Sequence, residues 1–216
     1  MNIDFARQQM IDQQVRAWTI LDPEVLDALM TTPREQFVPP AFESLAFADT
    51  EIPLGHGQFM MTPTVEGRVL QALELTRDDS ILEIGTGSGF LTACLARLGS
   101  FVTSIDIYDE FVQDAAVRLK EAGIENTALT TMDATQELPA GQYDAIVITA
   151  SVQTLDSQFI EALQPGGRLF VVVGSAPVMD ARLARRADDG RWHSDSLFET
   201  ELSALVNSAS PSQFSF

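Results

Sequence analysis

Cysteine, basic residues and long apolar runs are all scarce in this sequence of 216 residues. Cys94 is the only cysteine, so no disulfide can form within the chain, and a reducing compartment is expected. Lys and Arg total 13 against 31 Asp and Glu, a formal charge of −18. Because nucleic-acid binding needs a basic face, this balance excludes DNA and RNA as expected partners. The acid excess is interpreted chiefly as a solvated surface, with attraction of a cation as the alternative.

No uncharged apolar run approaches the roughly 20 residues that span a bilayer, and residues 1–7 lack the pattern of a signal peptide. The sequence therefore predicts a cytoplasmic protein without a membrane partner. With two histidines and one cysteine, no metal-ligand pattern exists, so no metal is expected. At 45% hydrophobic and 20% charged, the chain is expected to form one globular domain over residues 1–216.

The first third of the chain, residues 1–75, has the spacing of helices. Ile11, Val15 and Trp18 fall on one helical face. Asp22-Pro23 and Thr62-Pro63 each pair a capping residue with proline at the first helical position, which predicts two further helices. Residues 39–40 and 55–57, rich in proline and glycine, indicate irregular chain between them.

From Ser80 onward, short apolar runs alternate with helical periods. This alternation predicts a Rossmann-like, doubly wound α/β sheet over residues 76–208, preceded by the N-terminal helices. A turn at residues 188–190 predicts a C-terminal antiparallel hairpin, and residues 202–206 are expected to add a strand. The tail, residues 209–216, is polar, although Phe214 and Phe216 are candidates for docking. The five predicted parallel strands are residues 81–84, 101–105, 128–132, 145–148 and 169–173.

The most informative segment is residues 83–89, Glu-Ile-Gly-Thr-Gly-Ser-Gly, between a predicted strand and a predicted helix. Glycines at such a position allow a tight turn and close approach of a ligand to the backbone. The third glycine, Gly89, comes two residues after the second, whereas a dinucleotide fingerprint needs three. The spacing resembles motif I of S-adenosylmethionine-dependent methyltransferases and disfavours a nicotinamide-dependent oxidoreductase.

Two further acids follow the next predicted strands. Asp106 stands 21 positions after Gly85, where a carboxylate can accept hydrogen bonds from both hydroxyls of a ribose. Asp133 ends the third strand and is a candidate acceptor for an adenine amino group, with a turn-capping role as the alternative. Together with Glu83, they are expected to converge where the strand order reverses.

The chain resembles protein-L-isoaspartate O-methyltransferases from about residue 10 to residue 206. The resemblance rests on five segments in chain order: residues 33–39 (Pro-Arg-Glu-Gln-Phe-Val-Pro), 52–58 (Ile-Pro-Leu-Gly-His-Gly-Gln), 83–89, 144–150 (Asp-Ala-Ile-Val-Ile-Thr-Ala) and 163–169 (Leu-Gln-Pro-Gly-Gly-Arg-Leu). It implies methyl transfer from S-adenosyl-L-methionine to the side-chain carboxylate of an isoaspartyl residue in a damaged protein or peptide, with S-adenosyl-L-homocysteine as product. A carboxylate is already a nucleophile at neutral pH, so catalysis would consist mostly of positioning.

The resemblance also implies the site residues. For the cofactor they are Gln58, Glu83, Gly85, Thr86, Gly87, Ser88, Gly89, Asp106, Ile107, Asp133 and Ala134. For the acceptor they are Phe59, Met60, Thr62, Thr149, Ala150, Ser151 and Val206, with Met61 at the catalytic position.

Met61 marks a departure from the family pattern, which has Thr-Ile-Ser after Gly-Gln, with the serine in the active site. Here the residues are Phe59, Met60 and Met61, and methionine donates no hydrogen bond. Thr62, Thr149 and Ser151 are hydroxyls that can compensate; the ordinary alternatives are a helix cap for Thr62 and turn positions for the others. Two other hypotheses therefore remain beside isoaspartyl methylation: a methyltransferase with a different acceptor, and a cofactor-binding protein that has lost catalysis.

Overall fold

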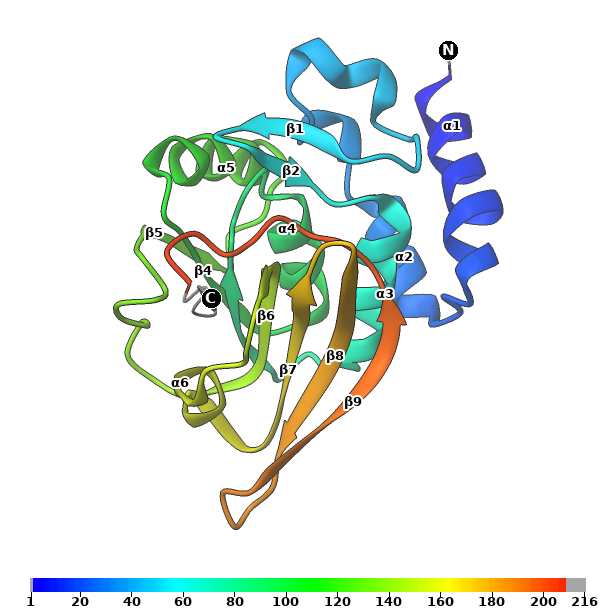
Figure 1. Cartoon of the computed structure of the whole chain (residues 1–216). Coiled ribbons are helices and arrows are strands. Elements are labelled where there is room, and N and C mark those ends of the chain that lie inside the picture. Colours follow the sequence, from blue (N-terminus) through cyan, green and yellow to red (C-terminus); the bar gives the residue numbers. More distant parts are fainter. Residues whose placement is uncertain (1, 209–216) are drawn as a thin grey trace, which may run out of the picture.

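The computed structural model describes residues 2–208 and is built around a seven-stranded sheet in the order β5-β4-β3-β6-β7-β8-β9 (Figure 1). β3 pairs in parallel with both β4 and β6, so the chain winds outward from β3 in two directions. β7–β8 and β8–β9 are antiparallel. The predicted fold class, a doubly wound sheet with a C-terminal antiparallel hairpin, is confirmed. The strands are β3 (Ser80–Ile84), β4 (Phe101–Asp106), β5 (Thr127–Thr131), β6 (Tyr143–Val152), β7 (Leu163–Ser175), β8 (Val178–Arg186) and β9 (Trp192–Glu199).

Helices cover the sheet because its central strands are apolar on both faces. Ile81 belongs to the core that the N-terminal helices share, whereas Leu82 and Ile84 belong to the core on the other face. This alternation is that of a pleated strand, and it places Glu83 on the same face as Ile81. The helices are α1 (Ile3–Met10), η1 (Ile11–Val15), η2 (Arg16–Trp18), α2 (Pro23–Thr31), η3 (Arg34–Gln36), η4 (Pro40–Leu45), α3 (Pro63–Leu73), α4 (Phe90–Leu98), α5 (Asp109–Glu121) and α6 (Ser157–Glu161).

The first helix begins earlier than the pattern predicts and changes its pitch midway. Asn2 caps α1, and a π-helical turn, η1, follows at Ile11–Val15. A π turn contains more residues than an α turn, so it rotates the following side chains relative to those before it. Ile11 and Val15 are buried as expected, but Trp18 is 49% exposed. The prediction that Trp18 shares their face is wrong for this reason.

A two-stranded hairpin, β1 (Ile52–Gly55) and β2 (Gln58–Met60), stands where the sequence indicated irregular chain. Its turn residues, His56 and Gly57, have φ angles of 52° and 70°. Positive φ at both positions is the signature of a type I′ turn, whose twist suits an antiparallel pair. In Figure 1 the hairpin lies over the edge of the sheet at which the parallel strands end.

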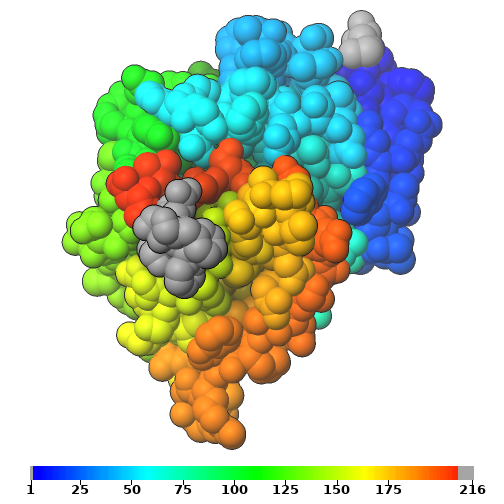
Figure 2. Space-filling model, viewed as in Figure 1, coloured from blue at the N-terminus to red at the C-terminus, as the bar shows by residue number. Residues whose placement is uncertain are grey.

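The segment after β9 crosses the same edge of the sheet (Figures 1 and 2, red). The prediction of a strand at residues 202–206 is wrong, because this segment makes one isolated bridge, between Ala204 and Ser151. Ser151 donates its N–H to the Ser203 carbonyl, and Leu205 donates its N–H to the Ser151 carbonyl, both at 2.8 Å. β3 pairs with β6 only as far as Ile148, so the later backbone of β6 is free to hold residues 203–205. Phe214 and Phe216 lie outside the described residues.

Within residues 2–208 the structure contains no helix of the length and hydropathy that crossing a bilayer requires.

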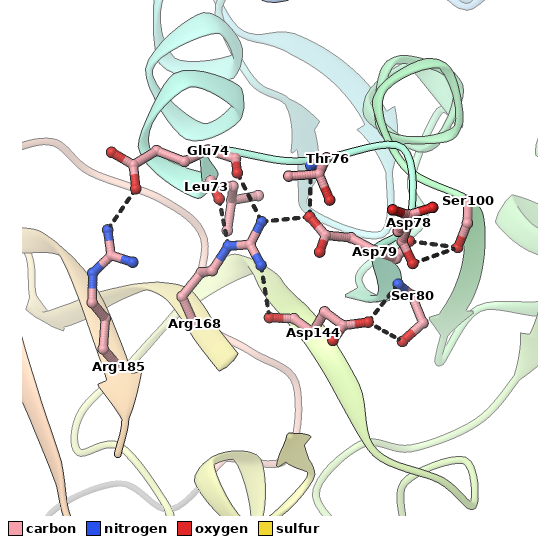
Figure 3. A network of polar contacts seen from close by, with 10 residues as sticks. All are labelled: Leu73, Glu74, Thr76, Asp78, Asp79, Ser80, Ser100, Asp144, Arg168 and Arg185. Carbon is pink, nitrogen blue, oxygen red and sulfur yellow. Dashed lines mark hydrogen bonds and ion pairs between the residues drawn. The ribbon is translucent and has the colours of Figure 1, made fainter. Parts of the chain in front are cut away.

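Arg168 on β7 forms a network of hydrogen bonds at the end of the sheet opposite the β1–β2 hairpin (Figure 3). Its guanidinium donates to the carbonyls of Leu73 at 2.5 Å and Glu74 at 2.9 Å, and to Asp79 Oδ2 at 2.6 Å. Burial alone would raise the pKa of Asp79, but hydrogen bonds from Arg168 and Thr76 hold it below its usual value. The chain after α3 is thus fastened to the start of β3 through one buried ion pair.

We expect Arg168→Met to lower the free energy of unfolding by about 3–5 kcal/mol, because Asp79 would remain buried without its partner. Arg185 lies directly across from Arg168 on β8, but its ion pair with Glu74 is exposed. Arg185→Met is therefore the matched control and should cost about 0–1 kcal/mol. Urea unfolding of the three proteins measures both values, and equal losses would contradict the assignment.

Candidate functional site

A cavity lies at the carboxyl ends of β3, β4 and β6. The β1–β2 hairpin and residues 204–206 cover it, so three distant parts of the sequence form its walls. This is the place at which open α/β sheets bind ligands, because the strand order reverses there. The lining residues are Leu54, Gln58, Phe59, Ile84, Gly85, Gly87, Ile105, Asp106, Ile107, Tyr108, Phe111, Met132, Asp133, Ala134, Thr149, Ala150, Ala204, Leu205 and Val206.

The glycine loop follows β3 and forms the floor of this cavity. Gly85 has a φ of 99° and donates its N–H to the Ile105 carbonyl at 2.8 Å. A Cβ on Gly85 would overlap Thr149 Oγ1, and a Cβ on Gly89 would lie 2.9 Å from the Cβ of Ala115. Both positions therefore need glycine, the first for conformation and packing and the second for the approach of α5.

Asp106 and Asp133 both line the cavity, as the sequence predicts. Asp106 accepts hydrogen bonds from the N–H groups of Gly87 at 2.9 Å and Tyr108 at 3.0 Å. Burial nevertheless raises the pKa of Asp106 above its usual value, against these bonds. Burial also opposes ionisation of Asp133, but hydrogen bonds from Thr135 and Asn207 outweigh it and lower its pKa. Both oxygens of Asp106 and Oδ2 of Asp133 keep a second lone pair for a ligand, whereas Asp133 Oδ1 already accepts from the N–H and the hydroxyl of Thr135.

Glu83 lies beneath the glycine loop, off the cavity wall. Its Oε2 accepts hydrogen bonds from the hydroxyls of Thr92 on α4 and Ser104 on β4, the latter at 2.6 Å. Its Oε1 is buried and has no partner among the described residues. Burial raises the pKa of Glu83 to about 8, although both hydroxyls lower it, so the carboxyl group is mainly neutral at pH 7.

A second compartment adjoins the cavity, and five residues line both: Leu54, Phe59, Gly85, Gly87 and Thr149. We call it the inner compartment. The rest of its wall comes from β2 and the residue after it, the starts of α3 and α4, and the glycine loop: Met60, Met61, Glu66, Thr86, Ser88 and Leu91. Its wall combines apolar side chains with three hydroxyls, and Glu66 is the single carboxyl group on it.

Arg34 supports this wall from behind. The fully buried guanidinium forms an ion pair with Glu66 and donates to the carbonyls of Ala46 and Met61, each at 2.8 Å. Its central carbon lies 4.7 Å from the centre of the Phe90 ring, within the range of a cation–π contact. Burial raises the pKa of Glu66 to about 7, although Arg34 opposes the shift. One side chain thus fixes the backbone at Met61 and the carboxyl group of Glu66 together.

An aromatic stack joins the hairpin turn to the start of α5. The ring of His56 lies on Tyr108 with 4.2 Å between ring centres, and Phe111 meets both rings edge-on. Tyr108 and Phe111 line the cavity, so the stack closes it beside Asp106. Among residues 2–208, no group of three or more His, Cys, Asp or Glu side chains is arranged to hold a metal ion.

The profile of the family described as protein-L-isoaspartate(D-aspartate) O-methyltransferase (PCMT) matches residues 5–209. The chain belongs to this family. A protein-L-isoaspartate O-methyltransferase of Opitutus terrae is 39% identical over 79% of this chain and 73% of its own length. Another, from Aliivibrio salmonicida, is 32% identical over 94% of this chain and 97% of its own length. A Plasmodium falciparum structure described as a PCMT in complex with S-adenosyl-L-homocysteine matches 95% of this chain and 98% of its own, with a TM-score of 0.80 and 18% identity, and so shows the same fold.

The structure brings most of the residues that the family resemblance implied to the two compartments. Four lie elsewhere: Glu83 and Gly89 beneath the loop, and Thr62 and Ser151 off both walls. Thr62 caps α3, accepting from the Val65 N–H, and Ser151 Oγ donates to the Leu202 carbonyl at 2.9 Å. The residues on the walls are Gln58, Gly85, Gly87, Asp106, Ile107, Asp133, Ala134, Phe59, Thr149, Ala150 and Val206 in the cavity, and Thr86, Ser88, Met60 and Met61 in the inner compartment.

Sequence reasoning missed Tyr108, Phe111 and Glu66. The signal for Glu66 was its place three, four and seven positions before Val69, Leu70 and Leu73, on the apolar face of a predicted helix. No local pattern marked the two aromatic residues.

Gly85→Ala should lower the free energy of unfolding by about 3 kcal/mol or more, from a positive φ and the overlap with Thr149. Gly123 also has a positive φ, 70°, but a Cβ there would meet open space. Gly123→Ala should therefore cost only about 1 kcal/mol. Thermal or urea unfolding of the two variants separates the strain of a positive φ from the clash with Thr149. Equal losses of unfolding free energy in Gly85→Ala and Gly123→Ala would show that the close contact between Gly85 and Thr149 is not needed.

Proposed function

We propose that this protein is an S-adenosyl-L-methionine-dependent methyltransferase that methylates the side-chain carboxylate of isoaspartyl residues in damaged proteins and peptides. The observation that carries the proposal is a family match over residues 5–209 together with a cavity at the strand-order reversal, lined by the glycine loop and two strand-end acids. The relatives are named for isoaspartyl methylation, and one structure of the same fold contains S-adenosyl-L-homocysteine.

The residues on the cavity wall fit this cofactor. Gly85 and Gly87 leave space above the loop for its methionine part. Asp106 has lone pairs for the two ribose hydroxyls, and Asp133 lies where it can accept from the adenine amino group. Ile107 and Ala134 add apolar surface for the flat base, and Tyr108 extends the same wall. When bound, S-adenosyl-L-methionine supplies an electrophilic methyl group on a sulfonium.

The chain's own contribution to the reaction is to hold an acceptor carboxylate in line with that methyl group. A carboxylate is ionised at neutral pH, so no residue needs to remove a proton. The apolar residues of the inner compartment, Met60, Met61 and Leu91, exclude water around the reacting oxygen. Thr149 is held by bonds from its hydroxyl to the carbonyls of Ile84 and Gly85, and so keeps the loop in position. Positioning of this kind can supply several kcal/mol of the barrier reduction.

A second candidate, methylation of a different acceptor, is favoured by one observation. Met61 lines the inner compartment without a hydrogen-bond donor, and an ionised Glu66 there would repel a carboxylate. A neutral hydroxyl or amine would then be the better acceptor.

An assay with labelled S-adenosyl-L-methionine distinguishes the two candidates. We expect base-labile methyl ester on a peptide containing isoaspartate and none on the same peptide with aspartate. The second candidate predicts an inactive wild type and an isoaspartyl activity gained by Met61→Ser. No ester above the enzyme-free blank from the wild type would contradict isoaspartyl methylation.

Asp106→Asn should weaken the binding of S-adenosyl-L-homocysteine by about tenfold to a hundredfold, because a charged acceptor of two hydroxyl hydrogen bonds becomes neutral. Asp109 is the matched control, since it lies three residues further on, bonded to Thr131 and off the cavity wall. Asp109→Asn should bind within about twofold of the wild type. Titration calorimetry measures all three affinities, and equal affinities for Asp106→Asn and the wild type would remove Asp106 from the cofactor site.

A further inference from the structure

The inner compartment contains few side chains that can donate a hydrogen bond to an acceptor carboxylate. The Thr149 hydroxyl already donates to backbone carbonyls, and Thr86 shares its proton with Ser104 at 2.7 Å. Ser88 Oγ accepts from the Phe90 N–H at 3.3 Å and keeps its own proton. A carboxylate bound there without donors would lose much of its hydration without replacement. The remaining polar side chain on this wall is that of Glu66.

The geometry of Glu66 leaves one oxygen for a ligand. Its side chain is 2% exposed, and Oε2 is taken by the guanidinium of Arg34. Within residues 2–208, no hydrogen bond reaches Oε1. A carboxyl group with a proton on Oε1 can therefore accept from Arg34 through one oxygen and donate into the inner compartment through the other.

Three titratable or charged groups face Glu66 from the elements packed against α3. Arg34 comes from η3, Glu83 from β3 and Cys94 from α4. Burial raises the pKa of Cys94 to about 12 and that of Glu83 to about 8, so neither is mainly charged at pH 7. Among residues 2–208, Arg34 is then the charge that opposes protonation of Glu66, and burial outweighs it. The neutral carboxyl group is therefore well populated near pH 7.

We propose that Glu66 binds the acceptor carboxylate by donating a hydrogen bond from its own carboxyl group, in place of the hydroxyl that Met61 lacks. This inference rests on the proposed function. In the complex one proton lies between two carboxyl groups, bonded to Glu66, and the negative charge of the acceptor favours the protonated form of Glu66 further. The proton stays on Glu66 throughout. The acceptor's other oxygen forms the new bond to the methyl carbon as the sulfonium carbon–sulfur bond breaks, which leaves a neutral ester and S-adenosyl-L-homocysteine.

The wild-type enzyme tests this proposal without a substitution. Because the donor is lost when Glu66 ionises, kcat/KM for an isoaspartyl peptide should fall about tenfold per pH unit above about pH 7. Binding of S-adenosyl-L-homocysteine should not follow this profile. Ser88, the rival donor, is neutral throughout this range, so a flat kcat/KM would overturn the proposal.

Substitutions at Glu66 distinguish hydrogen-bond donation by its carboxyl group from its contribution to packing. Glu66→Gln retains an acceptor for Arg34 and a permanent donor, so its profile should be flat, and it should exceed the wild type about tenfold near pH 8. Glu66→Ala should lose at least tenfold in kcat/KM near pH 6.5, with the loss mainly in KM. Adding Met61→Ser to Glu66→Ala supplies a hydroxyl and should recover activity independently of pH.

Asp79→Asn is the matched control, because it alters another buried carboxylate paired with an arginine, remote from both compartments. Its pH midpoint should equal that of the wild type. The same midpoint in Glu66→Gln as in the wild type would overturn the proposal while leaving the proposed function intact. A wild type that methylates no isoaspartyl peptide would overturn the proposed function, and this inference with it.

Discussion

A single buried guanidinium holds together the parts of the chain that form the inner compartment. Arg34 contacts the carbonyl of Ala46 before β1, the carbonyl of Met61 after β2, the carboxyl group of Glu66 on α3 and the ring of Phe90 on α4. These contacts join the N-terminal helices, the β1–β2 hairpin and α4 at one point. Because a buried charge without its partner costs several kcal/mol, the pair of Arg34 and Glu66 restricts where α3 and the hairpin can lie. The wall facing the glycine loop is therefore set by electrostatics as well as by packing.

The same interaction reconciles a strongly acidic protein with an anionic acceptor. At a net charge of −18, the field at a distance disfavours a carboxylate. Near the glycine loop, however, burial keeps Glu83 mainly neutral and raises the pKa of Glu66 to about 7. Asp133 stays ionised on the other side of the cavity, where a cofactor rather than an acceptor would lie. Burial thus separates a wall that tolerates an anion from one that carries negative charge.

Sequence patterns predicted the features that depend on residues within one short segment. The glycine loop and Asp106 follow apolar strand runs, so their positions at the sheet edge could be predicted before the structure was known. Trp18 was misplaced because a π turn interrupts the period that the prediction assumed. The stack of His56 on Tyr108 joins residues 52 positions apart, and no single-segment pattern encodes such a contact. Glu66 on an apolar helix face was a visible conflict between pattern and chemistry, and the residue that resolves it, Arg34, lies 32 positions away.

A measurement of the protonation state of Glu66 tests most directly whether its carboxyl group donates to the acceptor. In protein labelled with ¹³C at the glutamate carboxyl carbons, the resonance of Glu66 is assigned by its absence from Glu66→Gln. With S-adenosyl-L-homocysteine bound, the account predicts a titration midpoint near 7 that moves upward when an isoaspartyl peptide is added. A midpoint at the usual value for glutamate that does not respond to the peptide would contradict it.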